Sequence, residues 1–361
     1  MRLANRPERP AAHLKSETLN LKPFVIATRG SALALAQANA VLAQCRAAFP
    51  RLTFALSIIK TTGDKLQTAS LANPDASLPK GLFTKELEVA LLNGEADLAV
   101  HSLKDLPTEL PAGLVLGAVG QRADVRDVLL YRAAESVRAQ LTEAATRPED
   151  WVPGQRLKRG LARVRTLADL PADSVVATSS TRRRALLLAA RPGLKVIELR
   201  GNVPTRLQKL AERADFDAML LAAAGLARLK YVIGSRGDLR GEGVPAGLRA
   251  VRLEPEEMLP AVGQAAVGIE VRAGDDRVVP VLEKLNHRNT HLCVRAERAF
   301  LRAMGGGCAS PVAAYAEVLG HQMRMRVVSF LGGPARRAEG RGEVSEPEQL
   351  GAQLAAAVKG G

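Results

Sequence analysis

One succession of residues recurs three times along the chain and limits the folds open to it. An apolar strand pattern ends, a short polar segment with an arginine follows, and a helical pattern begins, at ATRGS (27–31), ATSSTRRR (177–184) and ELRGNVPTR (198–206). Strands and helices that alternate in this way predict βαβ units, which build largely parallel sheets covered by helices. Ligands of such sheets bind beyond the carboxyl ends of the strands, where these arginines fall.

The alternating pattern divides the chain into three parts. The first 120 residues predict strands at 24–28, 53–61 and 96–102, and helices at 31–49 and 81–94. The pattern returns from about 174, with strands at 174–180, 195–199 and 217–225. From about 278, a helix at 291–304 is followed by alternating strands. The expected class is therefore α/β, with a small α+β domain at the end.

The formal net charge of +14 predicts a polyanionic partner, such as nucleic acid, an acidic membrane or an acidic small molecule. Nucleic acid fits poorly because stacking aromatics are scarce, with one Trp and three Tyr. A helix N-terminus attracts anions through its free N–H groups and its dipole, and arginine adds a planar fork for carboxylate or phosphate. Three arginine-bearing junctions favour a small polyanionic ligand over a merely basic surface.

The chain has no apolar run near the roughly 18 residues of a membrane span. Residues 1–22 are polar, contain prolines and lack an apolar signal core, so we expect a flexible extension and a cytoplasmic protein. Residues 132–165 are charged, rich in small residues and hold the single Trp, which predicts an insertion. A solvated surface excursion is favoured there over a basic face for RNA or membrane.

The three cysteines form neither a disulfide framework nor a zinc pattern. Cys45 and Cys293 lie at helical spacing among apolar residues, and we expect both to be buried. Cys308 lies instead in AMGGGCASPV (303–312), a glycine-rich stretch closed by a proline that does not look like a core segment built to bury a thiol. His287 and His291 are spaced like a metal pair on a helix, but no third ligand accompanies them, and no metal is expected.

Lys104 and Asp105 follow directly on the predicted strand 96–102, at the rim where ligands should lie. An aspartate among arginines can stabilise a cation within an otherwise anionic ligand, or it can transfer protons. The alternative is a Lys–Asp turn before Pro107 with a structural role only. This segment alone does not choose between the two.

Six longer segments resemble the porphobilinogen deaminase family, also called hydroxymethylbilane synthases. They are ATRGSALALAQA, TTGDK, KGLFTKELEVALLNGEADLAVHSLKDLP, RRRALLLAARPGLKVIELRGNVPTRLQKL, LPAVGQAAVGIEVR and LNHRNTHLCVRAERAFLRAMGGGCASPVAAYAEV, in family order across about 24–331 apart from the insertion. The resemblance implies a transferase of tetrapyrrole and haem biosynthesis. Such an enzyme deaminates four porphobilinogen molecules, joins them head to tail on a covalently bound dipyrromethane primer, and releases hydroxymethylbilane by hydrolysis.

The resemblance also implies site residues. Cys308 matches the cysteine that carries the dipyrromethane cofactor through a thioether. Asp105 matches the catalytic aspartate, which stabilises pyrrole nitrogens and cationic intermediates and assists proton transfer. The residues that match cofactor- and substrate-binding positions are Arg29, Ser31, Phe83, Lys104, Thr178, Ser180, Arg182, Arg183, Arg200, Arg206 and Gln264. A growing chain with two carboxylates per ring needs many cationic partners, which agrees with the arginines and with the net charge.

The implied fold is two type II periplasmic-binding-protein-like domains around a cleft, plus a small C-terminal α+β domain. We expect the first domain at 23–121 and 256–276, the second at 122–255 with the insertion, and the cofactor-bearing domain at 277–361. The resemblance further suggests a monomer. Residues 66–79 are expected to form a mobile lid that excludes water.

The sequence departs from the family pattern at four places. Ala265 replaces a usual Gly, Ala309 a usual Gln, and RADVRD (122–127) the commoner REDPRD near the hinge, while Arg236 comes two residues late for a further family arginine. A non-catalytic two-domain anion-binding protein is the alternative function. It would keep the arginine cleft but would not need Asp105 and Cys308 together.

Overall fold

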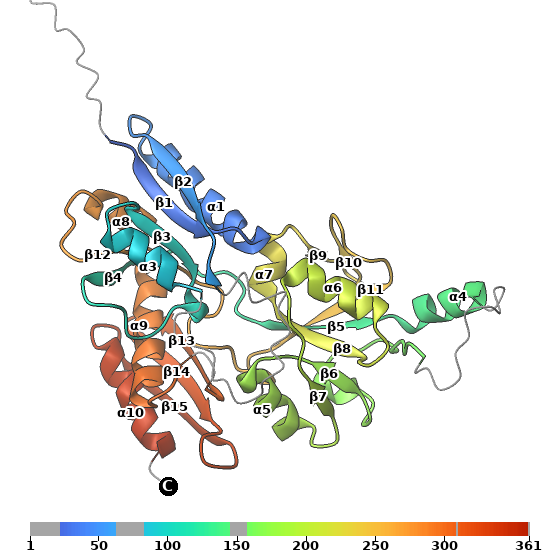
Figure 1. Ribbon diagram of the computed structural model, residues 1–361. Coiled ribbons are helices and arrows are strands. Elements are labelled where there is room, and N and C mark those ends of the chain that lie inside the picture. The colour runs from blue at the N-terminus through green and yellow to red at the C-terminus, as the bar shows by residue number, and fades with distance from the viewer. Residues whose placement is uncertain (1–21, 63–82, 145–156, 308–309, 360–361) are drawn as a thin grey trace, which may run out of the picture.

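The computed structural model describes residues 22–62, 83–144, 157–307 and 310–359 (Figure 1). Two α/β units and a terminal α+β unit, each built on its own sheet, confirm the expected fold class. Several expectations lie outside the described residues, namely 1–21 of the extension, the lid at 66–79, 145–156 of the insertion, and Cys308 with Ala309.

The first sheet carries the Asp105 segment at the end of a central strand. Its strand order is β2 (Phe54–Ile59), β1 (Phe24–Arg29), β3 (Leu98–Ser102), β12 (Val267–Arg272) and β4 (Leu114–Val119). β1 pairs in parallel with β2 and β3, whereas β12 runs antiparallel to β3 and β4. Buried residues of α1 (Ala32–Ala48) and α8 (Val279–Leu285) cover one face, and those of α3 (Lys85–Leu92) cover the other. Burial on both faces explains why these strands are largely apolar.

The second sheet repeats the same arrangement. Its order is β7 (Lys195–Ile197), β6 (Val175–Ala177), β8 (Ala218–Ala222), β5 (Asp127–Arg132) and β11 (Leu248–Leu253). β6 is parallel to β7 and β8, and β5 is antiparallel to β8 and β11. In each sheet the antiparallel fourth strand follows directly on the other unit along the chain. This is the paired architecture that the periplasmic-binding-protein-like expectation describes. Two hinge segments cross between the units, the outgoing one at 120–126 and the returning one at 254–266.

The other elements of the second unit connect its strands. They are the helices α4 (Ala134–Ala144), α5 (Thr181–Ala190), α6 (Val203–Glu212) and α7 (Ala223–Arg228), and the hairpin β9 (Val232–Ile233) with β10 (Leu239–Arg240). α5 and α6 each begin directly after a strand of the sheet, as the sequence pattern predicts. Their N-termini therefore lie at the carboxyl ends of β6 and β7.

The third unit is an antiparallel sheet packed on two helices. β13 (Val312–Leu319), β14 (Gln322–Ser329) and β15 (Arg336–Glu343) pair in chain order, and α9 (Arg288–Ala303) and α10 (Pro347–Lys359) pack against them. Gly351 of α10 lets the two helices approach closely, because a Cβ there would lie 2.2 Å from the carbonyl oxygen of Ala296. The unit directly precedes and follows the loop that holds Cys308.

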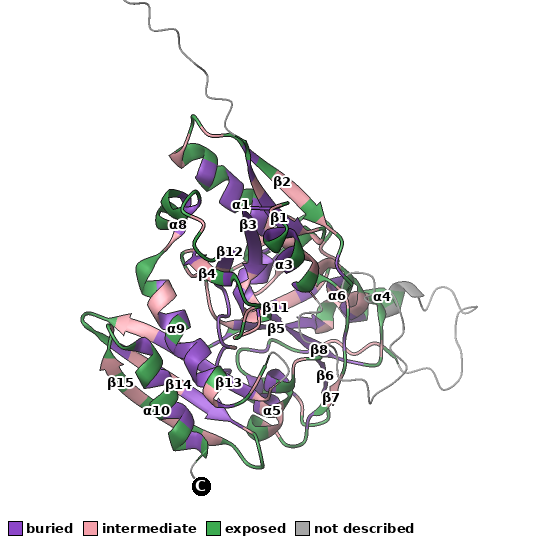
Figure 2. Cartoon of the chain, turned by 60° about the vertical axis from the view of Figure 1, so that its left-hand side comes forward, coloured by how far each residue is buried: buried purple, intermediate pink, exposed green. Residues whose placement is uncertain are grey.

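Apolar residues fill the interior of each unit, and the sheet strands are largely buried (Figure 2). Cys45 and Cys293 are both buried, as predicted, and burial raises their pKa values to about 11 and about 12. Thiols protonated to that degree are poor nucleophiles. Within the described ranges, no helix has the length and apolar character that crossing a membrane requires.

Two segments near the sequence-based limits pack into the cores of the α/β units. Arg132 ends β5 with a buried side chain, and Leu161 and Val164 are buried in the same unit, so both ends of the segment 132–165 belong to its core. Between them, α4 projects from the second unit (Figure 1). α8 lies beyond residue 277 but packs against α1 and β4 of the first unit, because its apolar side chains complete that core.

A buried carboxylate on α9 joins the third unit to the hinge. Arg122 donates two hydrogen bonds to the carboxylate of Glu297, at 2.6 and 3.0 Å, and the Glu297 side chain is fully buried. The same carboxylate accepts the backbone N–H groups of Gly263, in the returning hinge segment, and Ala316, on β13. Because a buried carboxylate is costly unless its oxygens are satisfied, these contacts hold hinge, α9 and β13 in one register.

Replacing this carboxylate tests its structural role. Glu297→Gln leaves the buried guanidinium of Arg122 without its counter-ion, and we expect a loss of about 3 kcal/mol or more in the free energy of unfolding. The control is Glu348→Gln, which removes a half-exposed ion pair with Arg295 and should cost less than about 1 kcal/mol. Urea unfolding of both variants measures the difference, and equal losses would contradict the assigned role.

Candidate active site

The first strand-to-helix junction forms a small pocket at the carboxyl end of β1. The Ser31 hydroxyl caps α1 by accepting the N–H of Ala34 at 3.3 Å. Arg29 ends β1, and its guanidinium lies 4.2 Å from the ring centroid of Phe83, a cation–π contact. Ser31, Arg29 and Phe83 line a pocket of about 70 Å³ together with Asp105. The structure thus brings together four of the predicted site residues.

Lys104 and Asp105 enter the site on a 3-10 turn, Leu103–Asp105, that follows β3 directly. Asp105 is exposed and Lys104 is half-buried. The pKa of Lys104 is lowered to about 8. Burial is the largest cause and the charge of Arg183 adds to it, whereas Asp105 has the opposite effect. Lys104 of the first unit therefore lies within electrostatic reach of an arginine from the second unit.

Arg206 approaches the same turn from the second unit. Its Nε–H donates to the carbonyl of Gly201 at 2.7 Å, which directs the guanidinium along the start of α6. Burial lowers the pKa of Arg206 to about 10, with a further contribution from Arg183 and an opposing one from Asp105. Asp105 thus lies among three cationic side chains drawn from both units.

Arg182 and Arg183 are engaged with a carboxylate that the sequence reasoning did not assign. Arg182 donates to Oδ2 of Asp127 at 2.7 Å, Arg183 donates to Oδ1 at 2.7 Å, and all three side chains are buried. Burial alone would raise the pKa of Asp127, but the two guanidiniums outweigh it and hold the pKa well below its usual range. Two guanidiniums against one carboxylate leave a net charge of +1 at the start of α5.

Gln264 and Thr178 are likewise occupied by protein contacts. Gln264 is fully buried, and its side-chain amide donates to the carbonyl of Val125 at 2.7 Å and to Asp127 at 3.2 Å. Thr178 is buried and its hydroxyl accepts the N–H of Ser180 at 3.2 Å. Gln264 and Thr178 therefore hold Asp127 and Ser180 in position.

The remaining predicted residues of the second unit lie at its rim. Ser180 is half-buried and caps α5, where its hydroxyl accepts the N–H of Arg183 at 3.4 Å. Arg200 is more exposed, and its guanidinium lies 3.5 Å from the carboxylate of Glu198.

His287 and His291, the two histidines with the spacing of a metal pair, make contacts within the protein. The Nδ1 atom of His287 accepts the N–H of Thr290 and caps α9, and Nδ1 of His291 lies 2.9 Å from the side-chain oxygen of Asn286. These contacts explain their spacing through local helix structure. Over the ranges that the structure describes, no three His, Cys, Asp or Glu side chains are grouped as metal ligands.

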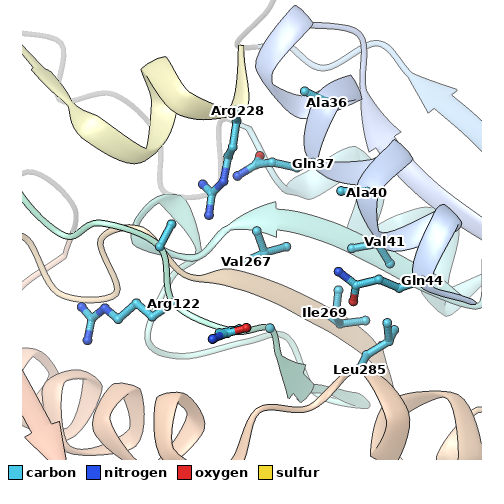
Figure 3. A pocket seen from close by; sticks show the side chains of 13 residues that line it. Ala36, Gln37, Ala40, Val41, Gln44, Arg122, Arg228, Val267, Ile269 and Leu285 are labelled. Carbon is cyan, nitrogen blue, oxygen red and sulfur yellow. The ribbon is translucent and has the colours of Figure 1, made fainter. Parts of the chain in front are cut away.

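A second pocket, of about 460 Å³, lies where α1, the outgoing hinge segment, β12 and α7 meet (Figure 3). Arg228 and Gln37 extend toward each other at one end, and Val41, Ile269 and Leu285 line the other (Figure 3). Gln37 also lines the small pocket at Arg29, where it exchanges hydrogen bonds of 3.0 Å with Ser102. The two pockets are therefore neighbours.

Arg228 is a residue that the sequence reasoning missed. Its guanidinium donates to the carbonyl of Ala265 at 2.6 Å, and burial lowers its pKa. Arg236, the doubtful position, lies between β9 and β10, where its carbonyl accepts a hydrogen bond from Arg249 at 2.8 Å. A sequence signal for Arg228 existed, because strand β8 is followed directly by helix α7 and Arg228 is the last residue of that helix.

Two family models match the chain in succession. The one described as "Porphobilinogen deaminase, dipyromethane cofactor binding domain" matches residues 24–280, and "Porphobilinogen deaminase, C-terminal domain" matches residues 291–360. The porphobilinogen deaminase of Moorella thermoacetica is 43% identical over 332 residues, which cover 91% of each chain. That of Thermus thermophilus is 42% identical over 339 residues, which cover 93% of this chain and 95% of the relative.

Solved structures give weaker likenesses. The BenM effector-binding domain with benzoate matches at 14% identity and a TM-score of 0.38, covering 73% of this chain and 90% of that chain. The OxyR regulatory domain from Pseudomonas aeruginosa matches at 11% identity and a TM-score of 0.36, covering 73% and 96%.

The pairing of Asp127 with two arginines makes stability depend on acidity. A carboxyl group whose pKa is lowered by folding stabilises the protein above its unfolded pKa of about 3.9, and this contribution is lost as the pH falls below that value. We expect Asp127→Asn to be less stable at neutral pH and to lose less further stability between pH 5 and 2.5 than the parent protein. Urea unfolding across this range measures both effects.

The matched control is Asp173→Asn. Asp173 pairs with Arg159 at 2.9 Å but has a side chain that is 78% exposed, so its removal should leave the dependence on pH unchanged. Equal slopes for Asp127→Asn and the parent protein would show that Asp127 does not titrate with folding.

Proposed function

The chain belongs to the porphobilinogen deaminase family, and we propose that its reaction takes place around Asp105, between the cationic side chains of the two α/β units. The activity is that of a hydroxymethylbilane synthase, a transferase of tetrapyrrole biosynthesis. It joins four porphobilinogen molecules head to tail with release of ammonia, and hydrolysis frees the linear product.

The reaction places two demands on the protein. Each porphobilinogen ring brings an acetate and a propionate, so the site must bind several carboxylates. Loss of ammonia leaves a cation that is shared between the ring nitrogen and the methylene carbon, so the same site must also stabilise positive charge. An anion-binding site therefore needs one carboxylate at its centre.

The cationic residues meet the first demand. Arg29 lines a pocket with Asp105, and the charge of Asp105 acts on Lys104 and Arg206. All three are proposed to bind substrate carboxylates. Arg182 and Arg183 add the net positive charge that their shared partner Asp127 leaves, and Arg200 extends the anion-binding surface to the rim. The hydroxyls of Ser31 and Ser180, at two helix N-termini, add donors for carboxylate oxygens.

The remaining residues are proposed to position the site, to stack on the rings or to add a cation. Gln264 and Thr178 are occupied by Asp127 and Ser180, which supports a positioning role for both rather than direct contact with substrate. Phe83 is proposed to stack beside the rings and to hold Arg29 in place. Arg228, which faces the larger pocket, is a better candidate than Arg236 for the further family arginine.

Asp105 meets the second demand, and its position carries the proposal. It is exposed on a turn beyond β3, within the electrostatic field of Lys104 and Arg206. A carboxylate at this position can stabilise the pyrrole nitrogen as ammonia departs. A protein that only bound anions would gain nothing from a carboxylate there.

The cofactor of the family is a dipyrromethane, which supplies the primer on which the chain is built. Cys308 is proposed to hold it through a thioether. The residues present fit such a group, because its carboxylates need cationic partners and Lys104, Arg183 and Arg206 lie within electrostatic reach of one another. Beside Cys308 and Ala309, the Gly307 N–H donates to the Ser310 hydroxyl at 3.0 Å.

Further features of the protein follow as proposals. We propose domain limits at 23–121 with 256–276, at 122–255 and at 277–361, with α8 packed on the first domain. Porphobilinogen is the substrate. We also propose that the protein is a cytoplasmic monomer that binds no nucleic acid, since its cationic residues are committed to carboxylates.

The test of the proposed site is Asp105→Asn, with hydroxymethylbilane formation measured from porphobilinogen. We expect kcat to fall about 10³-fold with little change in KM, because the neutral amide no longer stabilises the cation while the arginines still bind substrate. The control is Glu109→Gln, an exposed acid four residues away, which should retain full activity. Activity of Asp105→Asn within threefold of the parent would contradict the proposal.

The lowered pKa of Lys104 gives a second expectation. Lys104 is cationic below a pH of about 8 and neutral above it, so it holds a substrate carboxylate less well as the pH rises. We expect KM for porphobilinogen to increase through pH 8, while Lys104→Arg, which stays charged, shows a flatter profile. Initial rates between pH 7 and 9 decide this, and identical profiles would exclude Lys104 from substrate binding.

A further inference from the structure

A buried acidic cluster lies beneath the Asp105 pocket and has no part in the chemistry described so far. His101 on β3 places its Nε2 atom 3.0 Å from Oε2 of Glu270 on β12, and their side chains are 4% and 0% exposed. Glu88 of α3 is buried close enough to both for their charges to act on it. The three groups come from three elements of the first unit.

The carboxylate of Glu270 is poorly satisfied for a buried charge. Its Nε2 neighbour is near but not aligned for a hydrogen bond, and neither oxygen of Glu270 accepts one within the described ranges. A buried carboxylate without donors is costly, and apolar side chains would fill the same space at a lower free energy. Its presence calls for a role other than packing.

The position of His101 indicates that role. His101 lines the pocket of about 70 Å³ together with Arg29 and Asp105. In the part of the chain that the structure describes, its buried Nε2 atom has no hydrogen-bond partner. A small rotation would align Nε2–H with Glu270, and Nδ1 would then carry the free lone pair of a neutral imidazole.

Glu88 keeps the negative charge of the cluster low. Burial raises the pKa of Glu88, and the neighbouring charge of Glu270 raises it further against the opposite effect of His101. Glu88 therefore holds a proton more readily than an ordinary glutamate.

The reaction requires a base at each addition. From the second addition onward, the attacking α-carbon belongs to a ring derived from porphobilinogen. Its π electrons form the new bond to the methylene carbon of the incoming cation. The C–H bond at the α-carbon must then break, so that its electron pair restores the aromatic ring, and the proton must pass to an acceptor.

We propose that His101 is this acceptor and that Glu270 stabilises the imidazolium that forms. Nδ1 takes the proton from the α-carbon, and the imidazolium then passes it to the ammonia released from the incoming ring, so that ammonium leaves and His101 is again neutral. Asp105 meanwhile stabilises the cation. The inference rests on the proposed function, because it assumes that the chemistry takes place in the Asp105 pocket.

The first test compares His101→Asn with the parent enzyme, using porphobilinogen that carries deuterium at its free α-carbon. We expect kcat to fall about 10²-fold, KM to stay within twofold, and a primary isotope effect to appear after the first addition, since breaking the C–H bond becomes rate-limiting. His321→Asn, which changes an exposed histidine, is the control and should behave like the parent. A fall in kcat without an isotope effect would overturn the proposal in favour of a structural role.

A second readout is independent of turnover. Nitrogen NMR of protein labelled in histidine reports the tautomer of His101, assigned by its loss in His101→Asn. We expect a neutral ring protonated at Nε2, and a shift of that signal in Glu270→Gln. A ring protonated at Nδ1 at neutral pH would overturn the proposal.

The two proposals fail in different ways. If Asp105→Asn is as active as the parent, the proposed site fails as a whole. If Asp105→Asn is inactive but His101→Asn is as active as the parent, only the role of His101 is lost.

Discussion

One buried carboxylate, Asp127, organises the interdomain site. It lies where the chain leaves the first unit and begins β5, and it binds Arg182 and Arg183 of α5 and the amide of Gln264 in the returning hinge segment. A carboxylate without these partners could not stay ionised at that depth, and two arginines without it would repel each other. The constraint therefore couples the start of α5 to both hinge segments, and it fixes where the positive charge of the second unit lies.

The rest of the site builds on that fixed charge. Because Asp127 neutralises only one of its two arginines, Arg183 still acts on Lys104 and Arg206 and lowers the pKa of each. Asp105 opposes both shifts from the other unit. The reaction uses this opposition, because carboxylates of the substrate need cations around them while the cation formed on loss of ammonia needs an anion beside it. One site can bind the substrate carboxylates and stabilise the cation. Asp105 lies on a turn after β3, and the arginines come from strand-to-helix junctions of both units.

Much of this was predictable from the sequence, for physical reasons. The periodic apolar patterns gave both α/β units, and Ser31 and Ser180 cap α1 and α5 as their places before helical patterns suggest. Burial of Arg182 and Arg183 was not predictable, since their partner Asp127 is 55 residues away from Arg182 along the chain. Asp127 ends RADVRD, a segment noted only for its hinge position. The packing of α8 was not predictable either, because α8 has the composition of either neighbour and only tertiary contacts show that it lies against the first unit.

The central claim is that the chain builds its product on a dipyrromethane held by Cys308 in this cationic site. The most direct measurement is the intact mass of the purified protein beside that of Cys308→Ala. The account predicts an excess over the bare chain equal to two porphobilinogen molecules less two ammonia, present in the parent protein or restored to it by porphobilinogen, and absent from the variant. A parent protein that keeps the mass of the bare chain after incubation with porphobilinogen would contradict it.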